Sequence, residues 1–268
     1  MHGHHSLQLE VAARVDRVYD FALPPLVLHG LYTGDEAPLA RWLQIRPANA
    51  VTVLDTHDGI GVIDVGADQA DPSLAGLLQA DQIDALVEGI HERSGGASRQ
   101  ATGAAASNVD LYQVNCTFWD ALGGDEARYG LARLLQLFVP GVPQIYYVGL
   151  LAGANDMELL ARTGIGRDVN RHCYGPDELE RALAQPVVRA LLALARLRCE
   201  HPAFGGEFDV PETAAGSLTL RWRREQDEAR LEADLAAGAF RLTYSDGGAT
   251  AEVTDLAQVA GPAPGRSR

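Results

Sequence analysis

Hydrophobic residues along the first two hundred positions follow helical and strand patterns in turn. Helical periodicity predicts helices at about 7–15, 26–44, 81–91, 126–138 and 177–199, with a loosening at Thr33–Gly34 and a break at Pro186. Runs of apolar and β-branched residues predict a short strand at 15–21 and buried strands at 50–55 and 143–149. Because strand, helix and strand follow one another, parallel pairing is favoured.

The last sixty or so residues show a different, alternating pattern. Leu218, Leu220 and Trp222 alternate with polar residues, and the same alternation returns at 231–235 and at 240–244 before a turn at 246–247. A small antiparallel β-domain is therefore predicted at the C-terminal end, with a disordered tail over 260–268. Only three strands precede it, whereas a closed eight-stranded (β/α)8 barrel takes about 250 residues. The predicted fold class is thus α/β, with part of a TIM barrel followed by an antiparallel β-domain.

Composition narrows the classes of function. The 268 residues are 47% hydrophobic and 22% charged, as in soluble globular proteins, and the net charge is −14. This charge argues against nucleic acid and anionic membranes as partners, and favours a small neutral or locally caged anionic ligand. No signal peptide and no run of about 18 apolar residues is found.

Cysteine and histidine spacing does not indicate a metal site. The three cysteines have no metal-ligand spacing, so reduced thiols and a cytoplasmic location are expected. Three histidines at positions 2, 4 and 5 have no carboxylate or thiol partner nearby, and neither a metal nor a cofactor is predicted.

Candidate active-site residues follow the strand predicted at 50–55. Asp55, His57 and Asp58 come at its end, where a parallel strand delivers polar side chains to the rim of a barrel, so an active-site edge is predicted. A stretch rich in Ser, Gly and Ala at 93–108 fits either a flexible linker or a mobile loop over a site. The second alternative draws support from the polar residues that follow it at 110–113.

The strand-end motif and several other stretches together resemble the sucrose phosphorylases of the α-amylase superfamily (glycoside hydrolase family 13 type). The resembling stretches are 15–25, 50–64, 101–108, 110–115, 140–149, 166–168 and 170–172. The resemblance implies a barrel segment at 1–59, from just after strand five to strand seven. It further implies an inserted domain with an acceptor-site loop at 60–123, a barrel segment to the last helix at 124–203, and a C-terminal β-domain at 204–268. Strands six to eight of the barrel would belong to this chain.

The same resemblance implies a reaction and a set of roles. Sucrose phosphorylases convert sucrose and phosphate reversibly to fructose and α-glucose 1-phosphate by a retaining double displacement. An Asp nucleophile and a Glu acid/base act in that reaction, and both fall outside this chain. By this resemblance Asp58 would be a catalytic third carboxylate, and His57 would bind the same sugar ring. Arg167 would be the charge partner beside the nucleophile. The acceptor site would be formed by Asp110, Tyr112 and Gln113.

Other interpretations of these residues stay open. His57 also fits a histidine that is hydrogen-bonded within a network at the strand end. Arg167 also fits an arginine in a solvated loop, and Tyr112 also fits an aromatic residue that only packs against its neighbours. Related phosphorylases acting on glucosylglycerol, glucosylglycerate or sucrose 6′-phosphate are alternatives, as is a non-catalytic carbohydrate-binding fragment. A homodimer is also left open.

The N-terminal residues bear on whether this chain is active. Met1–His2 matches the last two positions of a family stretch that reads Glu, apolar residue, His. The acid/base glutamate is therefore expected directly before Met1, with Met1 an internal methionine of a longer frame. The isolated chain is expected to be inactive.

Overall fold

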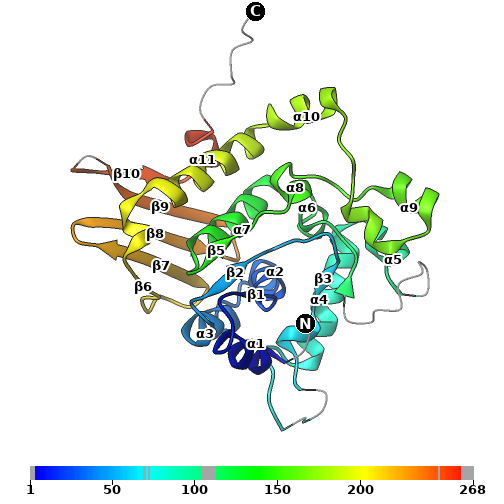
Figure 1. Ribbon diagram of the computed structural model, residues 1–268, viewed down its shortest axis with the longest axis horizontal. Coiled ribbons are helices and arrows are strands. Elements are labelled where there is room, and N and C mark those ends of the chain that lie inside the picture. The colour runs from blue at the N-terminus through cyan, green and yellow to red at the C-terminus, as the bar shows by residue number, and fades with distance from the viewer. Residues whose placement is uncertain (1–3, 69–70, 72, 104–112, 247, 261–268) are drawn as a thin grey trace, which may run out of the picture.

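The computed structural model describes residues 4–68, 71, 73–103, 113–246 and 248–260. It is an α/β structure with a three-stranded parallel sheet at its centre, a two-stranded antiparallel ribbon, and a five-stranded antiparallel sheet at one end (Figure 1). This agrees with the predicted change from a parallel α/β arrangement to an antiparallel β-domain. The domain boundaries inferred from the sequence stay a prediction.

The parallel sheet has the order β1-β2-β5. Val18 in β1 is aligned with Ala50 in β2, and Val51 in β2 is aligned with Val142 in β5. Its strands are β1 (Val18–Asp20), β2 (Ala50–Thr52) and β5 (Val142–Pro143). The three strands expected before the β-domain are thus present within the described part of the chain.

The buried strand predicted at 143–149 is wrong in both extent and burial. β5 ends at Pro143, Val142 is 49% exposed, and helix α8 (Tyr147–Leu150) takes up the remainder. The Gln136 side chain donates to the carbonyls of Gln144 and Thr52, at 2.8 and 3.0 Å. The Thr52 carbonyl also accepts from the Gln144 amide at 2.9 Å, so one backbone bond continues just past β5 beside the side-chain bonds from Gln136.

Helices form close to where periodicity predicts them. The stretch at 26–44 forms two helices because the chain turns at Gly34, which has φ of 77°, and the predicted break at Pro186 is confirmed. The helices concerned are α1 (His5–Ala12), α2 (Leu23–Thr33), α3 (Ala37–Ile45), α7 (Glu126–Phe138), α10 (Pro176–Leu183) and α11 (Pro186–Glu200).

A buried carboxylate fixes the first strand against its helices. Asp20, at the end of β1, accepts hydrogen bonds from the Leu23 amide (3.1 Å), the Trp42 indole (3.0 Å) and Arg46 Nε (2.8 Å). All of these partners lie in or beside α2 and α3, so one side chain caps the start of α2 and holds α3 against the strand.

The residues between β2 and α7 form a ribbon and short helices. β3 (Ile60–Gly61) pairs with β4 (Gln113–Val114), and part of the stretch at 93–108 is the helix α5 (Ala97–Ala101) rather than linker or loop. Residues 104–108 lie outside the described residues. The other elements here and after α8 are η1 (Ile63–Val65), α4 (Ala80–Arg93), α6 (Phe118–Ala121), α9 (Met157–Thr163) and η3 (Gly166–Asn170).

The antiparallel sheet packs against α7 and α11 (Figure 1). Its alternating residues Leu218, Leu220 and Trp222 face inward, and the Trp222 indole donates to the Phe138 carbonyl at the end of α7, at 2.6 Å. The sheet has the order β10-β9-β8-β7-β6, after the short η4 (Pro202–Gly205), and η5 (Leu256–Gln258) follows it. Its strands are β6 (Glu207–Asp209), β7 (Ser217–Arg224), β8 (Asp227–Asp234), β9 (Ala239–Asp246) and β10 (Ala249–Val253). The tail predicted to be disordered lies, from 261 on, outside the described residues.

The described part of the chain bears on three expectations, for membrane-spanning helices, cysteines and groups of metal-ligating side chains. Within it, no helix has both the length and the apolar character needed to cross a membrane. The three cysteines are free, with Cys116 buried and Cys173 and Cys199 exposed. In the same residues no group of three or more His, Cys, Asp or Glu side chains could hold a metal ion.

Candidate active site

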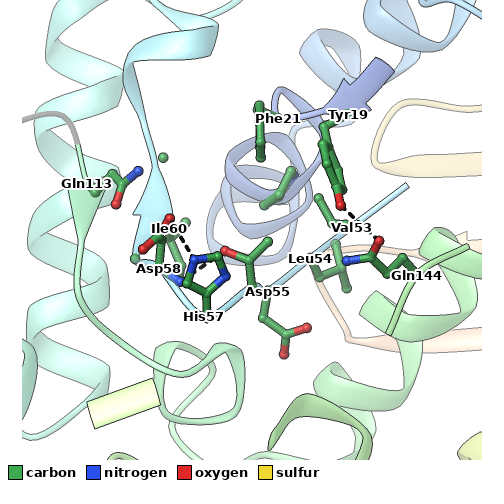
Figure 2. A pocket seen from close by; sticks show the side chains of 14 residues that line it. Tyr19, Phe21, Val53, Leu54, Asp55, His57, Asp58, Ile60, Gln113 and Gln144 are labelled. Carbon is green, nitrogen blue, oxygen red and sulfur yellow. Dashed lines mark hydrogen bonds and ion pairs between the residues drawn. The ribbon is translucent and has the colours of Figure 1, made fainter. Parts of the chain in front are cut away.

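A cavity of about 140 Å³ lies where the chain leaves β2 (Figure 2). Residues 53–61 line one side of it, and Tyr19 in β1 and Phe21 directly after β1 line another. Tyr19 Oη donates to Gln144 Oε1 at 3.1 Å across the open side. The cavity therefore lies at the carboxyl ends of the parallel strands, where α/β folds place ligand sites.

Asp58 is the charged centre of this region. Its Oδ1 lies 2.9 Å from Arg167 Nη1 and 3.6 Å from Arg171 Nη2, and its Oδ2 lies 3.6 Å from His57 Nε2. Asn170 Nδ2 donates to the Asp58 carbonyl at 2.9 Å, and Arg171 Nε donates to the His57 carbonyl at 3.0 Å. The segment from η3 to Arg171 thus binds both the backbone and the side chain of the turn after β2.

Two glycines allow these loops to approach one another. A Cβ on Gly59 would lie 2.8 Å from both Asn115 Oδ1 and the Val114 carbonyl, and one on Gly166 would lie 2.0 Å from the Ala101 carbonyl. Asn115 Nδ2 donates to that same Ala101 carbonyl at 2.7 Å. A side chain at Gly59 would push the Asp58 turn away from Val114 and Asn115, and one at Gly166 would push the start of η3 away from Ala101 and Asn115.

Asp55 lines the cavity, and its carboxylate pairs with an arginine of the core. Arg133, on α7, is 0% exposed, and its Nη2 lies 2.5 Å from Asp55 Oδ2 and 2.7 Å from the Tyr129 hydroxyl. Burial by itself lowers the pKa of Arg133, but the Asp55 carboxylate and Tyr129 outweigh burial and raise it. Figure 2 shows Asp55 pointing away from His57 and Asp58. All three polar residues line the cavity, as expected, but the Asp55 carboxylate is bound by Arg133 whereas the His57 side chain is exposed.

The structure brings together most of the predicted site residues that it describes. Asp58, His57 and Arg167 are in contact, and Gln113 in β4 lines the same cavity. Asp110 and Tyr112 lie outside the described residues. Arg167 contacts Asp58, a partner that the sequence did not assign to it. The His57 side chain is 66% exposed.

Sequence reasoning missed three residues of this arrangement. Arg171 and Asn170 stand in a polar loop with Arg167, and the density of hydrogen-bonding side chains there was the available signal. Arg133 gave no signal, because one arginine in an amphipathic helix ordinarily faces water.

Comparisons with known proteins point to one group of enzymes. No protein-family profile matches the chain. Sucrose phosphorylase from Agrobacterium vitis is 57% identical over 245 residues, which cover 91% of this chain and 50% of that protein. Sucrose phosphorylase from Bifidobacterium adolescentis is 56% identical over 231 residues, covering 86% and 46%. The chain spans about half the length of these curated relatives.

Solved structures agree with the sequence matches. The crystal structure of sucrose 6F-phosphate phosphorylase from Thermoanaerobacter thermosaccharolyticum matches with a TM-score of 0.82 at 35% identity, over 95% of this chain and 50% of that one. An α-amylase from H. orenii matches with a TM-score of 0.53 at 13% identity and shares the fold alone. Over most of its length the chain is thus similar to about half of a glycoside phosphorylase. These matches support the sequence resemblance to the C-terminal half of a sucrose phosphorylase.

Proposed function

We propose that this chain supplies the C-terminal half of a sucrose phosphorylase, an enzyme that converts sucrose and phosphate reversibly to fructose and α-glucose 1-phosphate. The observation that carries the proposal is the Asp58 carboxylate at the end of β2, with His57 and two arginines converging on it. In this assignment β1, β2 and β5 are strands six, seven and eight of a (β/α)8 barrel, and their order β1-β2-β5 supports it.

Asp58 would act on the sugar ring as a fixed negative charge. Retaining glycosidic cleavage passes through a transition state in which positive charge develops on the ring, and a carboxylate held in place stabilises that charge. Arg167 donates a hydrogen bond to Oδ1 of Asp58. Oδ2, which faces His57, is then left to accept hydrogen bonds from sugar hydroxyl groups. In this proposal the nucleophile and the acid/base are supplied by the other half of the enzyme, which these 268 residues do not span.

The acceptor side of the reaction would be shaped by the chain around β4. Gln113 is buried and lines the cavity, and the family correspondence adds Asp110 and Tyr112. Plain sucrose is favoured because the two relatives above 50% identity in these comparisons are both sucrose phosphorylases. Identity near 40% does not separate the acceptors, since a glucosylglycerol phosphorylase from Marinobacter adhaerens is 40% identical and a sucrose phosphorylase from Streptococcus mutans is 38% identical. Fructose and phosphate would then occupy this side in turn. A cytoplasmic location and a homodimer stay predictions.

A chimera tests the proposal. Residues of this chain replace the matching residues of the Agrobacterium vitis relative, and release of glucose 1-phosphate is measured with phosphate and each of sucrose, glucosylglycerol, glucosylglycerate and sucrose 6′-phosphate. We expect turnover with sucrose above the other three, and none from the isolated chain. A folded chimera that releases no glucose 1-phosphate would contradict the proposal, and a preference for another glucoside would contradict the assigned acceptor.

A further inference from the structure

One histidine outside the cavity is bonded through both of its ring nitrogens. His172 Nδ1 lies 2.6 Å from Asp156 Oδ2, and its Nε2 lies 2.7 Å from Glu178 Oε1. The residue follows Arg171 directly, and Arg171 contacts the turn that carries Asp58. A neutral imidazole has one donor nitrogen and one acceptor nitrogen, whereas carboxylates on both sides require two donors. The geometry is therefore that of a protonated ring.

The two carboxylates connect this ring to different helices. Asp156 caps α9, accepting from the Leu159 amide at 2.7 Å, and its own amide donates to the Val169 carbonyl in η3 at 3.0 Å. Glu178 lies in the first turn of α10. His172 therefore joins α9 and α10 to the short helix η3, which carries Arg167 and leads into Arg171.

Other groups face the same ring. The Tyr174 ring meets it edge-on with centroids 4.6 Å apart, and the Tyr147 hydroxyl donates to the His172 carbonyl at 2.7 Å. Arg181 and Glu158 line the adjoining cavity of about 600 Å³. Burial by itself lowers the pKa of His172, but the bonds to Asp156 and Glu178 outweigh burial and raise it.

We propose that His172 is a positioning residue, whose protonated ring holds η3 in place so that Arg167 and Arg171 remain on Asp58, and which releases that segment when the ring loses its proton. Its effect on phosphorolysis rests on the proposed function, whereas the effect on η3 does not. A group whose pKa is raised by folding contributes its full stabilisation below the unfolded value, about 6.5 for histidine, and loses it as pH rises through the folded value. The arginine segment should therefore loosen toward alkaline pH.

Hydrogen exchange of the 268-residue chain tests this directly. Exchange of the peptide covering 165–172 is followed by mass spectrometry from about pH 5.5 to about pH 9.5, after correction for the intrinsic pH dependence of exchange. We expect protection to fall about tenfold across the His172 titration, the effect of losing one charge-assisted hydrogen bond. H172Q should lack both the acid-side protection and the step. H172R, which cannot lose its charge, should keep protection at alkaline pH.

A second histidine provides the matched control. His201 also bonds through a ring nitrogen, with Nε2 2.8 Å from the Ser245 carbonyl, but it lies beside the antiparallel sheet. H201Q should leave the exchange of 165–172 and its pH step unchanged. The proposal is overturned if the parent shows no step, if H172Q retains it, or if H172R loses protection at alkaline pH as the parent does. An inactive chimera would count against the proposed function and would leave these exchange results unaffected.

Discussion

Replacing Arg133 by methionine should destabilise the protein more than most single substitutions. The arginine is 0% exposed, the Asp55 side chain is 8% exposed, and methionine fills similar space without a charge. Without the guanidinium, Asp55 keeps a buried negative charge whose Oδ1 already has no hydrogen-bond partner. Breaking a buried ion pair in this way costs about 3–5 kcal/mol, a large part of the roughly 5–15 kcal/mol that stabilises a typical domain.

A double variant separates the cost of the orphaned charge from the cost of lost packing. Replacing Asp55 by leucine together with R133M removes both charges, and a buried pair replaced by apolar residues often leaves stability nearly unchanged. The double variant should therefore be more stable than R133M alone, by about 2 kcal/mol or more.

Urea unfolding followed by circular dichroism measures these differences. Arg196, on α11, is the control because it is largely exposed and its nearest carboxylate contact is 3.9 Å away, so R196M should change the free energy of unfolding by less than about 0.5 kcal/mol. A loss below about 1 kcal/mol for R133M, or a double variant no more stable than R133M, would refute the reasoning about the buried pair.

Two further predictions concern the same core and the thiols. G149A should destabilise the protein and disturb the Asp55–Arg133 pair, because the new Cβ would lie 1.8 Å from Asp55 Oδ2, whereas G175A, with no atom within 4 Å, should be nearly neutral in the same unfolding assay. Equal midpoints for the two variants would contradict this packing argument. Burial raises the pKa of Cys116 to about 12, so at about pH 8 an aromatic disulfide reagent should label Cys173 and Cys199 in the folded chain and Cys116 only in urea. Rapid labelling of Cys116 without denaturant would show that this part of the core opens.

The sequence predicts elements well where one physical signal decides them. The helix at 126–138 has an apolar face and a stop at Pro140–Gly141, and the structure ends α7 at Phe138. The polar residues after the strand at 50–55 likewise mark the site, because the carboxyl end of a buried parallel strand is where α/β folds place their functional side chains.

Features that depend on packing between distant segments escape such reasoning. The chain after β5 turns into α8 at Tyr147, while Gln136 on α7 bonds to the Gln144 carbonyl, and neither contact is visible in the apolar run at 143–149. The pairing of Asp55 with Arg133 joins residues 78 positions apart, so no local pattern predicts it. The hydrogen bond from Arg171 to the His57 carbonyl joins residues 114 positions apart, so no local sequence pattern predicts it.

In the proposed function, Asp58 stabilises the positive charge that develops on the sugar in the transition state. The D58N variant of the chimera tests this role most directly. Asparagine is nearly isosteric, so folding should persist while the charge is lost. Loss of such a contact typically costs about 10²-fold in rate. D84N, which removes a charge from an exposed position on α4, is the control and should retain parental turnover.

The measurement is kcat and kcat/KM for sucrose, with and without phosphate. We expect D58N to lower both constants about 100-fold whether or not phosphate is present, because cleavage by phosphate and by water shares the first glucosyl-transfer step. Near-parental turnover of D58N, in a chimera as well folded as D84N, would contradict the role assigned to Asp58.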